Sequence, residues 1–432
     1  MTDVLNPTNE ASTAGSLWDR DLVLERYRRH VNVGLAKLAE FTSLPLEVRS
    51  EGSLVFDEKG EAYLDCGGYG VFILGHRHPA VVQAVMEQLD RHPLATRVLL
   101  NPDLARSAET LASVTPPGLD YVFFTNSGTE ATEAGIKVAR LNGKRKLIAT
   151  HGGFHGKTMG ALSVTGRPHH QDPFKPLLPD VEFVPFGDAG ALRDAVGRHG
   201  DEACVILEPV QAEGGVNIPP PGYLRDVEQI CRHHGAFFIL DEIQTGLGRL
   251  GVWWGADREG VVPDALLVGK NLSGSAVPVG ALVSTAAAWE TLNKHPLLHT
   301  STFAGNPLAM AAAHAAITTI KREGIPERAR VLGEELLQTI RGILEERCPD
   351  LVVEVRGVGL LIAIEFKADY LAGDFMFQLL QRNVVVSHSL NTNRVMRLTP
   401  PAILKDSEKQ WLFDAVADAA IEMDQHKADF AS

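Results

Sequence analysis

The sequence predicts an α/β protein, in which a mostly parallel sheet flanked by helices forms a large domain and a smaller α+β domain completes the chain. The chain has 432 residues, 45% of them apolar, which is enough for more than one small core. Short, continuous apolar runs alternate with helix-length segments in its middle, as expected for buried parallel strands. After about residue 326 the order changes to a helix-like stretch followed by strand-like runs, which indicates a second domain.

Composition excludes several classes of protein. With 41 Lys and Arg against 54 Asp and Glu, the net charge is -13, which argues against a partner such as nucleic acid that binds basic surfaces. The four cysteines lie far apart and form no CxxC pair, so we expect reduced thiols and no metal site. No apolar run approaches the roughly 18 residues of a membrane helix. We therefore expect a cytoplasmic protein without a membrane partner.

The first 65 residues contain two predicted elements. Apolar residues recur at helical spacing from Asp19 to about Thr42, which predicts one amphipathic helix. The segment SLVFDEKGEAYLD (53–65) has two strand-like runs around the turn at Glu58–Gly60 and predicts a hairpin.

The middle of the chain supplies the strands of the predicted sheet. The runs are YVFFT (121–125), KLIATH (146–151), CVILEP (204–209), AFFILDE (236–242) and ALLVGK (265–270). The Ala-rich stretch 308–317 has the strongest helix-forming composition. We place the domain boundaries so that 1–60 contributes to the small domain, 61–325 forms the large domain and 326–432 completes the small one.

The motif Asn126-Ser127-Gly128-Thr129-Glu130 follows a predicted strand and opens a predicted helix. Ser127 and Glu130 have the spacing of a capping box, which places a helix N-terminus here. The free N–H groups of such an end, beside a Ser and a Thr, make a natural phosphate site. The alternative is a capped helix that binds nothing.

Charged residues stand at the ends of three predicted strands: Glu208 after CVIL, Asp241 at the end of AFFILD, and Lys270 after ALLVG. Because ligands of open parallel sheets collect at the carboxyl ends of strands, these side chains are expected to converge on one crevice. Each could instead mark the point where a buried strand meets solvent. A lysine, a carboxylate and a phosphate-binding helix N-terminus are the groups that bind and activate pyridoxal phosphate. In this interpretation Lys270 forms the Schiff base and then acts as acid and base, and Asp241 lies beside the ring nitrogen of the cofactor.

The sequence resembles the class III pyridoxal-phosphate aminotransferases of fold type I, from about residue 45 to the C-terminus. The motifs that carry the resemblance are LGHRHP (74–79), FFTNSGTEATEAGIKVAR (123–140), HGGFHGKTMGALS (151–163), ILEPVQAEGG (206–215), DEIQTGLGRLG (241–251), PDALLVGKNLSG (263–274), STFAGNP (301–307) and MRLTPP (396–401). The family's fold implies a seven-stranded sheet in the large domain.

The resemblance also implies roles for the cofactor site. Ser127, Gly128 and Thr129 would hold the phosphate, Phe154 would stack on the pyridine ring beside His155, and Gln244 would bond the cofactor's 3′-oxygen. Glu208 and Asp241 complete the expected cofactor set. Thr302 would reach the phosphate of a neighbouring subunit, which implies a homodimer with two shared sites.

For the substrate, the resemblance implies that Arg397 binds a carboxylate and that Glu213 pairs with Arg397 when no carboxylate is present. Tyr69 matches an aromatic residue of the substrate pocket. Local motifs are closest to putrescine and ω-amine aminotransferases, so we expect a diamine or ω-amino donor and a 2-oxo acid acceptor such as 2-oxoglutarate or pyruvate, linked through pyridoxamine phosphate. A racemase, aminomutase or decarboxylase on the same fold, and a biosynthetic aminotransferase for a specialised aldehyde or ketone, are the alternatives.

Overall fold

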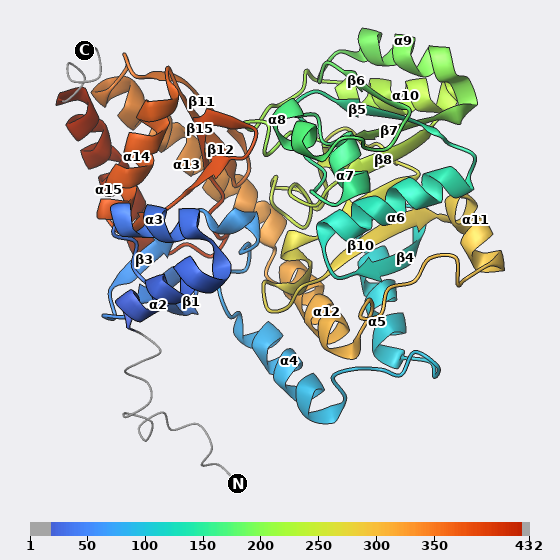
Figure 1. Ribbon diagram of the computed structural model, residues 1–432, viewed down its shortest axis with the longest axis horizontal. Helices are drawn as coiled ribbons and strands as arrows, with labels where there is room; N and C mark the ends of the chain where they lie inside the picture. The colour runs from blue at the N-terminus through green and yellow to red at the C-terminus, as the bar shows by residue number, and fades with distance from the viewer. Residues whose placement is uncertain (1–18, 426–432) are drawn as a thin grey trace.

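The computed structural model describes residues 19–425 and shows two lobes (Figure 1). The large lobe is built from the middle of the chain, and the small lobe combines its N-terminal and C-terminal parts. Across residues 19–425, no helix combines the length and the apolar character that a membrane crossing needs.

A seven-stranded sheet forms the centre of the large lobe. Its strands, in spatial order, are β4 (Leu119–Thr125), β10 (Gly280–Thr285), β9 (Ala265–Val268), β8 (Phe237–Asp241), β7 (Ala203–Leu207), β5 (Lys146–Thr150) and β6 (Val181–Val184). Strand β10 runs antiparallel to both neighbours, and the other pairings are parallel. Every residue of β7, β8 and β9 is buried, as their continuous apolar sequence predicts.

Helices cover both faces of this sheet and extend below it (Figure 1). They are α4 (Pro79–Arg91), α5 (Pro102–Ala112), α6 (Gly128–Leu141), α7 (Met159–Val164), α8 (Pro168–Gln171), α9 (Ala189–His199), α10 (Tyr223–His234), α11 (Ala286–Lys294) and α12 (Pro307–Arg322). The Ala-rich stretch predicted as a helix lies within α12, and most of its side chains are buried.

The small lobe contains two four-stranded sheets. The first has the order β1 (Glu47–Glu51), β2 (Leu54–Asp57), β3 (Ala62–Asp65) and β13 (Val384–Val385). The second has the order β11 (Val352–Val358), β12 (Leu361–Phe366), β15 (Thr392–Leu398) and β14 (Ser387–Ser389). Its helices are α2 (Arg20–Arg26), α3 (Val33–Phe41), α13 (Ile325–Arg347), α14 (Asp369–Gln381) and α15 (Asp406–Gln425).

The pairing of β3 with β13 joins the two ends of the chain in one sheet. This pairing supports a small domain made from both ends, while the boundaries at 60 and 325 stay predictions. The predicted hairpin at 53–65 is confirmed, because β2 and β3 pair antiparallel across its turn.

The prediction of one helix from Asp19 to Thr42 was wrong. Helix α2 passes into a π-helical turn at 27–31, and the chain then becomes extended at Asn32 with φ of -164°. The Asn32 side chain accepts a hydrogen bond from the Leu35 N–H and caps a separate helix, α3. Apolar spacing alone did not reveal this capping residue.

Candidate active site

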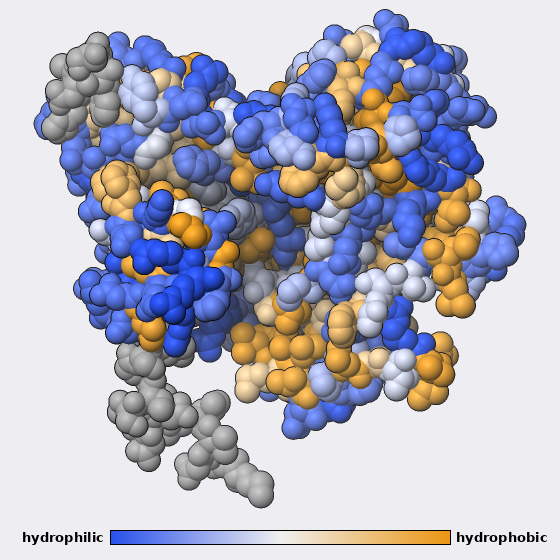
Figure 2. Space-filling view, viewed as in Figure 1, coloured by the Kyte–Doolittle hydropathy of each residue, from blue (hydrophilic) through white to orange (hydrophobic). Residues whose placement is uncertain are grey.

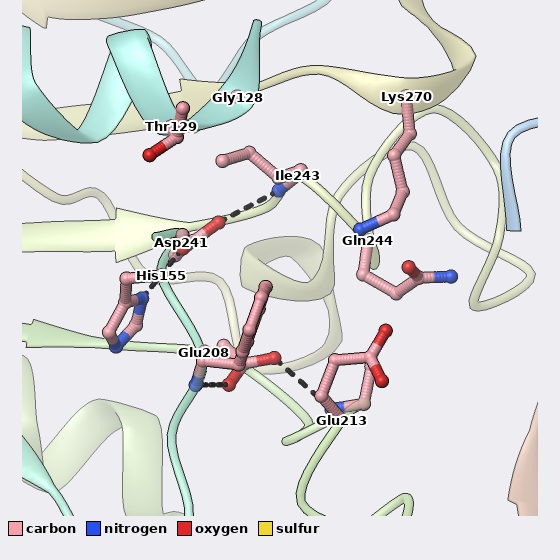
Figure 3. Close-up of a pocket in the computed structure, with 12 residues that line it drawn as sticks. Gly128, Thr129, His155, Glu208, Glu213, Asp241, Ile243, Gln244 and Lys270 are labelled. Carbon is pink, nitrogen blue, oxygen red and sulfur yellow. Dashed lines mark hydrogen bonds and ion pairs between the residues drawn. The ribbon is translucent and has the colours of Figure 1, made fainter. Parts of the chain in front are cut away.

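The carboxyl ends of neighbouring strands meet at one edge of the large sheet. Leu207 pairs with Leu240, and Asp241 pairs with Leu267, so the ends of β7, β8 and β9 lie side by side. Beyond these ends lies a cavity of about 230 Å³, which we call the central cavity (Figure 3). It is lined by Gly128, Thr129, Phe154, His155, Gly156, Glu208, Ala212, Glu213, Asp241, Ile243, Gln244 and Lys270. The predicted convergence of Glu208, Asp241 and Lys270 is confirmed.

The N-terminus of α6 forms one wall of the central cavity. Ser127 is its N-cap, and the Ser127 Oγ accepts a hydrogen bond from the Glu130 N–H at 3.3 Å. The Glu130 carboxylate accepts from the N–H of Asn126 at 2.9 Å, one residue earlier than a capping box requires. Gly128 and Thr129 follow the cap and line the cavity, so a helix N-terminus faces this space.

Asp241 is held in place from two sides. Its Oδ2 lies 2.7 Å from His155 Nδ1, and its Oδ1 accepts from the Ile243 N–H at 3.0 Å (Figure 3). Burial on its own would lower the pKa of His155, but the hydrogen bond to Asp241 and the charges of Asp241 and Glu208 outweigh it and raise the pKa. The contact with Asp241 therefore favours the protonated form of the His155 imidazole.

Glu208 connects two backbone segments beside the cavity. One of its oxygens accepts from the Phe154 N–H at 3.0 Å, and the other accepts from the Ala212 N–H at 3.1 Å. Burial, with a further contribution from Asp241, raises the pKa of Glu208 to about 7. Glu208 thus fixes the backbone of Phe154 and of the residue before Glu213.

Lys270 lies just after β9 in a turn with φ of 42°, a strained conformation for a residue with a side chain. Its side chain extends into the central cavity on the side of Gln244 and Glu213 (Figure 3). Burial lowers the pKa of the Lys270 amine; the charge of Arg397 also lowers it, and that of Glu213 opposes the shift. A lowered pKa favours the neutral, nucleophilic amine.

Gln244 and His155 leave buried polar atoms without a protein partner in the described part of the chain. Both amide atoms of Gln244 and the Nε2 of His155 have none. Because buried polar atoms are normally paired and Gln244 lines the cavity, its unpartnered amide fits a polar group bound there.

Arg397 and Glu213 form an almost fully buried ion pair. The Arg397 Nη1 lies 2.8 Å from the Glu213 Oε1, and the second Glu213 oxygen accepts from the Leu390 N–H at 2.9 Å. Glu213 lines the central cavity and Arg397 lies behind it on β15. The pairing predicted for the two residues is therefore present, and neither residue is a surface charge.

Residues 40–420 match the model of the family described as aminotransferase class-III. The chain belongs to the class III aminotransferases. This aminotransferase is 43% identical over 415 residues to putrescine aminotransferase of Pectobacterium atrosepticum, a match that covers 93% of this chain and 87% of that protein.

Solved structures of other aminotransferases share the fold. Ornithine aminotransferase from Toxoplasma gondii superposes with a TM-score of 0.89 at 31% identity, covering 98% of this aminotransferase and 100% of that chain. An (S)-enantioselective omega-transaminase from Thermomicrobium roseum gives 0.85 at 29% identity, covering 93% and 98% of the two chains. The predicted family and fold class are confirmed.

Four predicted site residues of this aminotransferase lie outside the lining of the central cavity, and one of them is Arg397, which reaches the cavity only through its ion pair with Glu213. Ser127 caps α6 without lining the cavity. Tyr69 is 68% exposed and lines a separate chamber in the small lobe. Thr302 is exposed in the segment between α11 and α12.

Sequence reasoning about this aminotransferase missed two contacts that shape the site. Ile243 holds Asp241 through its backbone N–H, and Leu390 holds Glu213 in the same way. Ile243 lies in the motif DEIQTGLGRLG (241–251), two residues after Asp241, so its closeness to Asp241 could have been predicted from the sequence. Leu390 is 177 residues from Glu213 in the chain, and backbone donation leaves no trace in residue type.

Proposed function

We propose that this chain is a pyridoxal-phosphate-dependent aminotransferase that moves an amino group from a diamine or ω-amino donor to a 2-oxo acid. The observation that carries the proposal is the convergence of Lys270, Asp241 and the α6 N-terminus on one cavity. The similarity to putrescine aminotransferase, and to an ornithine aminotransferase whose crystal structure has partial occupancy of PLP at the active site, supports the same activity.

The residues of the central cavity fit this cofactor. Gly128 and Thr129 at the helix N-terminus, with Ser127 fixing its first turn, would hold the phosphate. Asp241 would face the ring nitrogen and Phe154 a ring face, while Gln244 offers an unpartnered amide for the ring oxygen. When bound, pyridoxal phosphate supplies an aldehyde that binds amines and a ring that withdraws electrons from the bound carbon.

The protein's own groups would provide the rest of the reaction. Burial lowers the pKa of Lys270, which favours the neutral amine that can accept a proton in the site, so Lys270 would be the group that accepts and returns the proton. The contacts with His155 and the Ile243 N–H hold the Asp241 carboxyl in position, where it would face the ring nitrogen. Glu208 keeps Phe154 at its place by binding its N–H.

Arg397 and Glu213 support two kinds of substrate in one site. While Glu213 neutralises Arg397, the cavity presents no free cation there, which suits a donor without a carboxylate near the reacting end. A 2-oxo acid would replace Glu213 on the guanidinium, which binds carboxylates in a bidentate manner. The two half-reactions would thus differ in the partner of Arg397.

We further propose a cytoplasmic homodimer in which Thr302 serves the partner's site. Large apolar side chains, among them Met86, Leu89, Val98, Leu99, Leu100, Leu297 and Phe303, are exposed along α4 and the segments next to α5 and α12. Figure 2 shows hydrophobic residues gathered over this end of the large lobe. A patch of this kind supports a protein interface, and four free, buried cysteines support a reducing compartment.

The test is a panel of donors (putrescine, cadaverine, ornithine, lysine, 4-aminobutyrate and β-alanine) with pyruvate or 2-oxoglutarate as acceptor. We expect alanine or glutamate to form in step with loss of the donor amine. Formation of neither amino acid with any donor would overturn the proposal. Inversion of an amino acid without amino transfer would point to a racemase instead.

A further inference from the structure

The ion pair of Glu213 and Arg397 is held differently at its two ends. Arg397 Nη1 lies 2.8 Å from one Glu213 oxygen, but neither this nitrogen nor Arg397 Nε has a hydrogen-bond partner within residues 19–425. The other Glu213 oxygen accepts a hydrogen bond from the Leu390 N–H at 2.9 Å. Attraction between the charges therefore acts on the arginine side, while a directed bond fixes the carboxylate on the side of Leu390.

Leu390 belongs to the two-residue turn that joins β14 to β15, which we call the hairpin turn (Leu390–Asn391). Ser389 and Thr392 pair on either side of it. Arg397 lies on β15, so one hairpin carries both the guanidinium and the N–H that holds its partner Glu213. The position of the hairpin turn against the large lobe therefore decides where the Glu213 carboxylate rests.

Asn391 fastens the hairpin turn to the large lobe. Its side-chain Nδ2 donates to the Gly152 carbonyl at 2.7 Å, and its backbone N–H donates to the Glu213 carbonyl at 3.0 Å. Asn391 is 1% exposed, and its Oδ1 has no partner in the part of the chain that the structure describes. A buried amide with one unpaired end lowers stability, and a small apolar residue would avoid this cost if packing were the only requirement.

The bond from Asn391 reaches the segment that leads into the central cavity. Gly152 stands two residues before Phe154, which lines the cavity. Loss of the Asn391 side chain would free the hairpin turn from this segment. The Leu390 N–H would then hold the Glu213 carboxylate less firmly.

The strength of this hold matters for the second half-reaction. An acceptor carboxylate can bind the guanidinium of Arg397 only in molecules whose Glu213 has moved away from it. The apparent affinity for the acceptor is reduced in proportion to the fraction of such molecules. Any group that keeps Glu213 in place therefore weakens acceptor binding and favours a donor without a carboxylate.

We propose that Asn391 is a positioning residue that keeps Glu213 on Arg397 through the Leu390 N–H. It thereby sets the relative affinity of the site for 2-oxo acids and for amines without a carboxylate. The inference rests on the proposed aminotransferase function and names a residue that controls its choice of substrate.

Asn391→Ala tests the proposal in the holoenzyme, because it removes the amide and keeps both backbone N–H groups of the hairpin turn. KM for 2-oxoglutarate should fall by about fivefold, and KM for putrescine should rise, since its distal ammonium meets an unpaired guanidinium more often. The matched control is Asn393→Ala, which removes an exposed amide of β15 that bonds to Asp369 at 3.3 Å and should change neither KM. Equal changes in the two variants, or a higher KM for 2-oxoglutarate in the Asn391 variant, would overturn the inference.

A double-mutant cycle shows whether Asn391 acts through Glu213. In a Glu213→Gln background there is no carboxylate to keep on the guanidinium, so Asn391→Ala should no longer change the ratio of the two KM values. A general loosening of the fold would change the ratio in both backgrounds. The same shift with and without the glutamate would therefore overturn the inference.

Binding of glutarate, a dicarboxylate without an oxo group, gives a result that needs no turnover. In isothermal titration calorimetry the Asn391→Ala holoenzyme should bind glutarate about fivefold more tightly than the parent. Binding that is unchanged, weaker or undetectable in the variant would overturn the inference. Tighter glutarate binding without amino transfer from any donor would support the role of Asn391 and contradict the proposed function instead.

Discussion

Burial sets the protonation of the side chains around the central cavity, and neighbouring charges then adjust it. Lys270 and Glu208 both shift toward their neutral forms, since removal from water disfavours a charge. His155 shifts the other way, because Asp241 lies 2.7 Å from its ring nitrogen. A neutral amine and a charged carboxylate are the two states that the proposed chemistry requires of Lys270 and Asp241.

Replacement of Lys270 by Ala tests the first of these assignments. The variant loses the amine that binds the cofactor and moves the proton, so amino transfer should fall at least about a thousandfold. Lys294→Ala, which removes an exposed lysine of α11, should retain full activity. Product formation is followed by chromatography, and near-normal turnover by the Lys270 variant would refute the assignment.

Arg397→Ala tests the carboxylate clamp. Loss of a buried guanidinium that binds carboxylates should raise KM for the 2-oxo acid by about tenfold to a hundredfold, with a much smaller change for a diamine. Arg394→Ala removes an exposed arginine of the same strand and should change neither KM. If KM for diamine and oxo acid rose equally in the Arg397 variant, Arg397 would not be the clamp.

Glu242 gives a prediction about stability and pH. Burial raises the pKa of this carboxyl from 4.5 to about 7. The folded state therefore favours the protonated form of Glu242. The stabilisation of the folded state by this proton is fully present below pH 4.5 and is lost as the pH rises through about 7. Glu242→Gln mimics the protonated form and should raise the free energy of unfolding at about pH 8 by about 3 kcal/mol.

Urea unfolding of both proteins at acidic and alkaline pH measures this effect. At about pH 4 the glutamine variant should match the parent, because the buried glutamate is then protonated in both states of the chain. The amide keeps an acceptor for the Ala256 N–H, which Glu242 binds at 2.8 Å. A variant that is less stable at every pH would show that the negative charge is needed.

The strands of the large sheet differ in how well the sequence predicted them. Strands β7, β8 and β9 were predictable because every residue in them is buried, and the residues at their ends became the site. Strands β6 and β10 were not among the predicted strands. Strand β10 carries Gly and Ser-Thr at its two ends, and it inserts antiparallel between β4 and β9 only through tertiary pairing.

Contacts between distant elements were the least predictable part of the site. The approach of Glu213 to Arg397 was implied by family resemblance alone, since nothing in residue spacing brings the loop after β7 to β15. The attachment of the same glutamate to the Leu390 N–H was not predicted at all. Backbone donors exist at nearly every residue, so only the folded chain shows which one is used.

Helix α6 provides a test at the scale of one element. Ser127→Ala removes its cap and should lower the stability by about 1 kcal/mol. If this N-terminus also holds the phosphate, the variant should release pyridoxal phosphate faster during dialysis. Asp188→Ala removes the cap of α9, where Asp188 accepts from the Ala191 N–H at 2.9 Å, and should lower stability without affecting release. If both variants released pyridoxal phosphate at the same rate, the N-terminus of α6 would not be the phosphate site.

The molecule as a whole leaves an apolar end that a single chain does not cover. Leu100 has no part of its side chain buried, and Val98 and Leu99 beside it are almost as exposed. Thr302 lies exposed in the segment before α12, next to exposed Phe303. If two chains associate through this end, the same contact buries the apolar side chains and brings each Thr302 to the partner's active site.

Leu100→Asp tests whether this apolar end is a dimer interface or an exposed patch without a partner. A buried carboxylate without a partner would weaken the interface, so the variant should become monomeric at micromolar concentration in light-scattering measurements. Activity should fall in parallel with the dimer fraction, because Thr302 would no longer reach a partner's site. Val353→Asp, on an exposed apolar residue of β11 in the small lobe, should stay dimeric and active. A fully active Leu100→Asp monomer would show that each chain completes its own site.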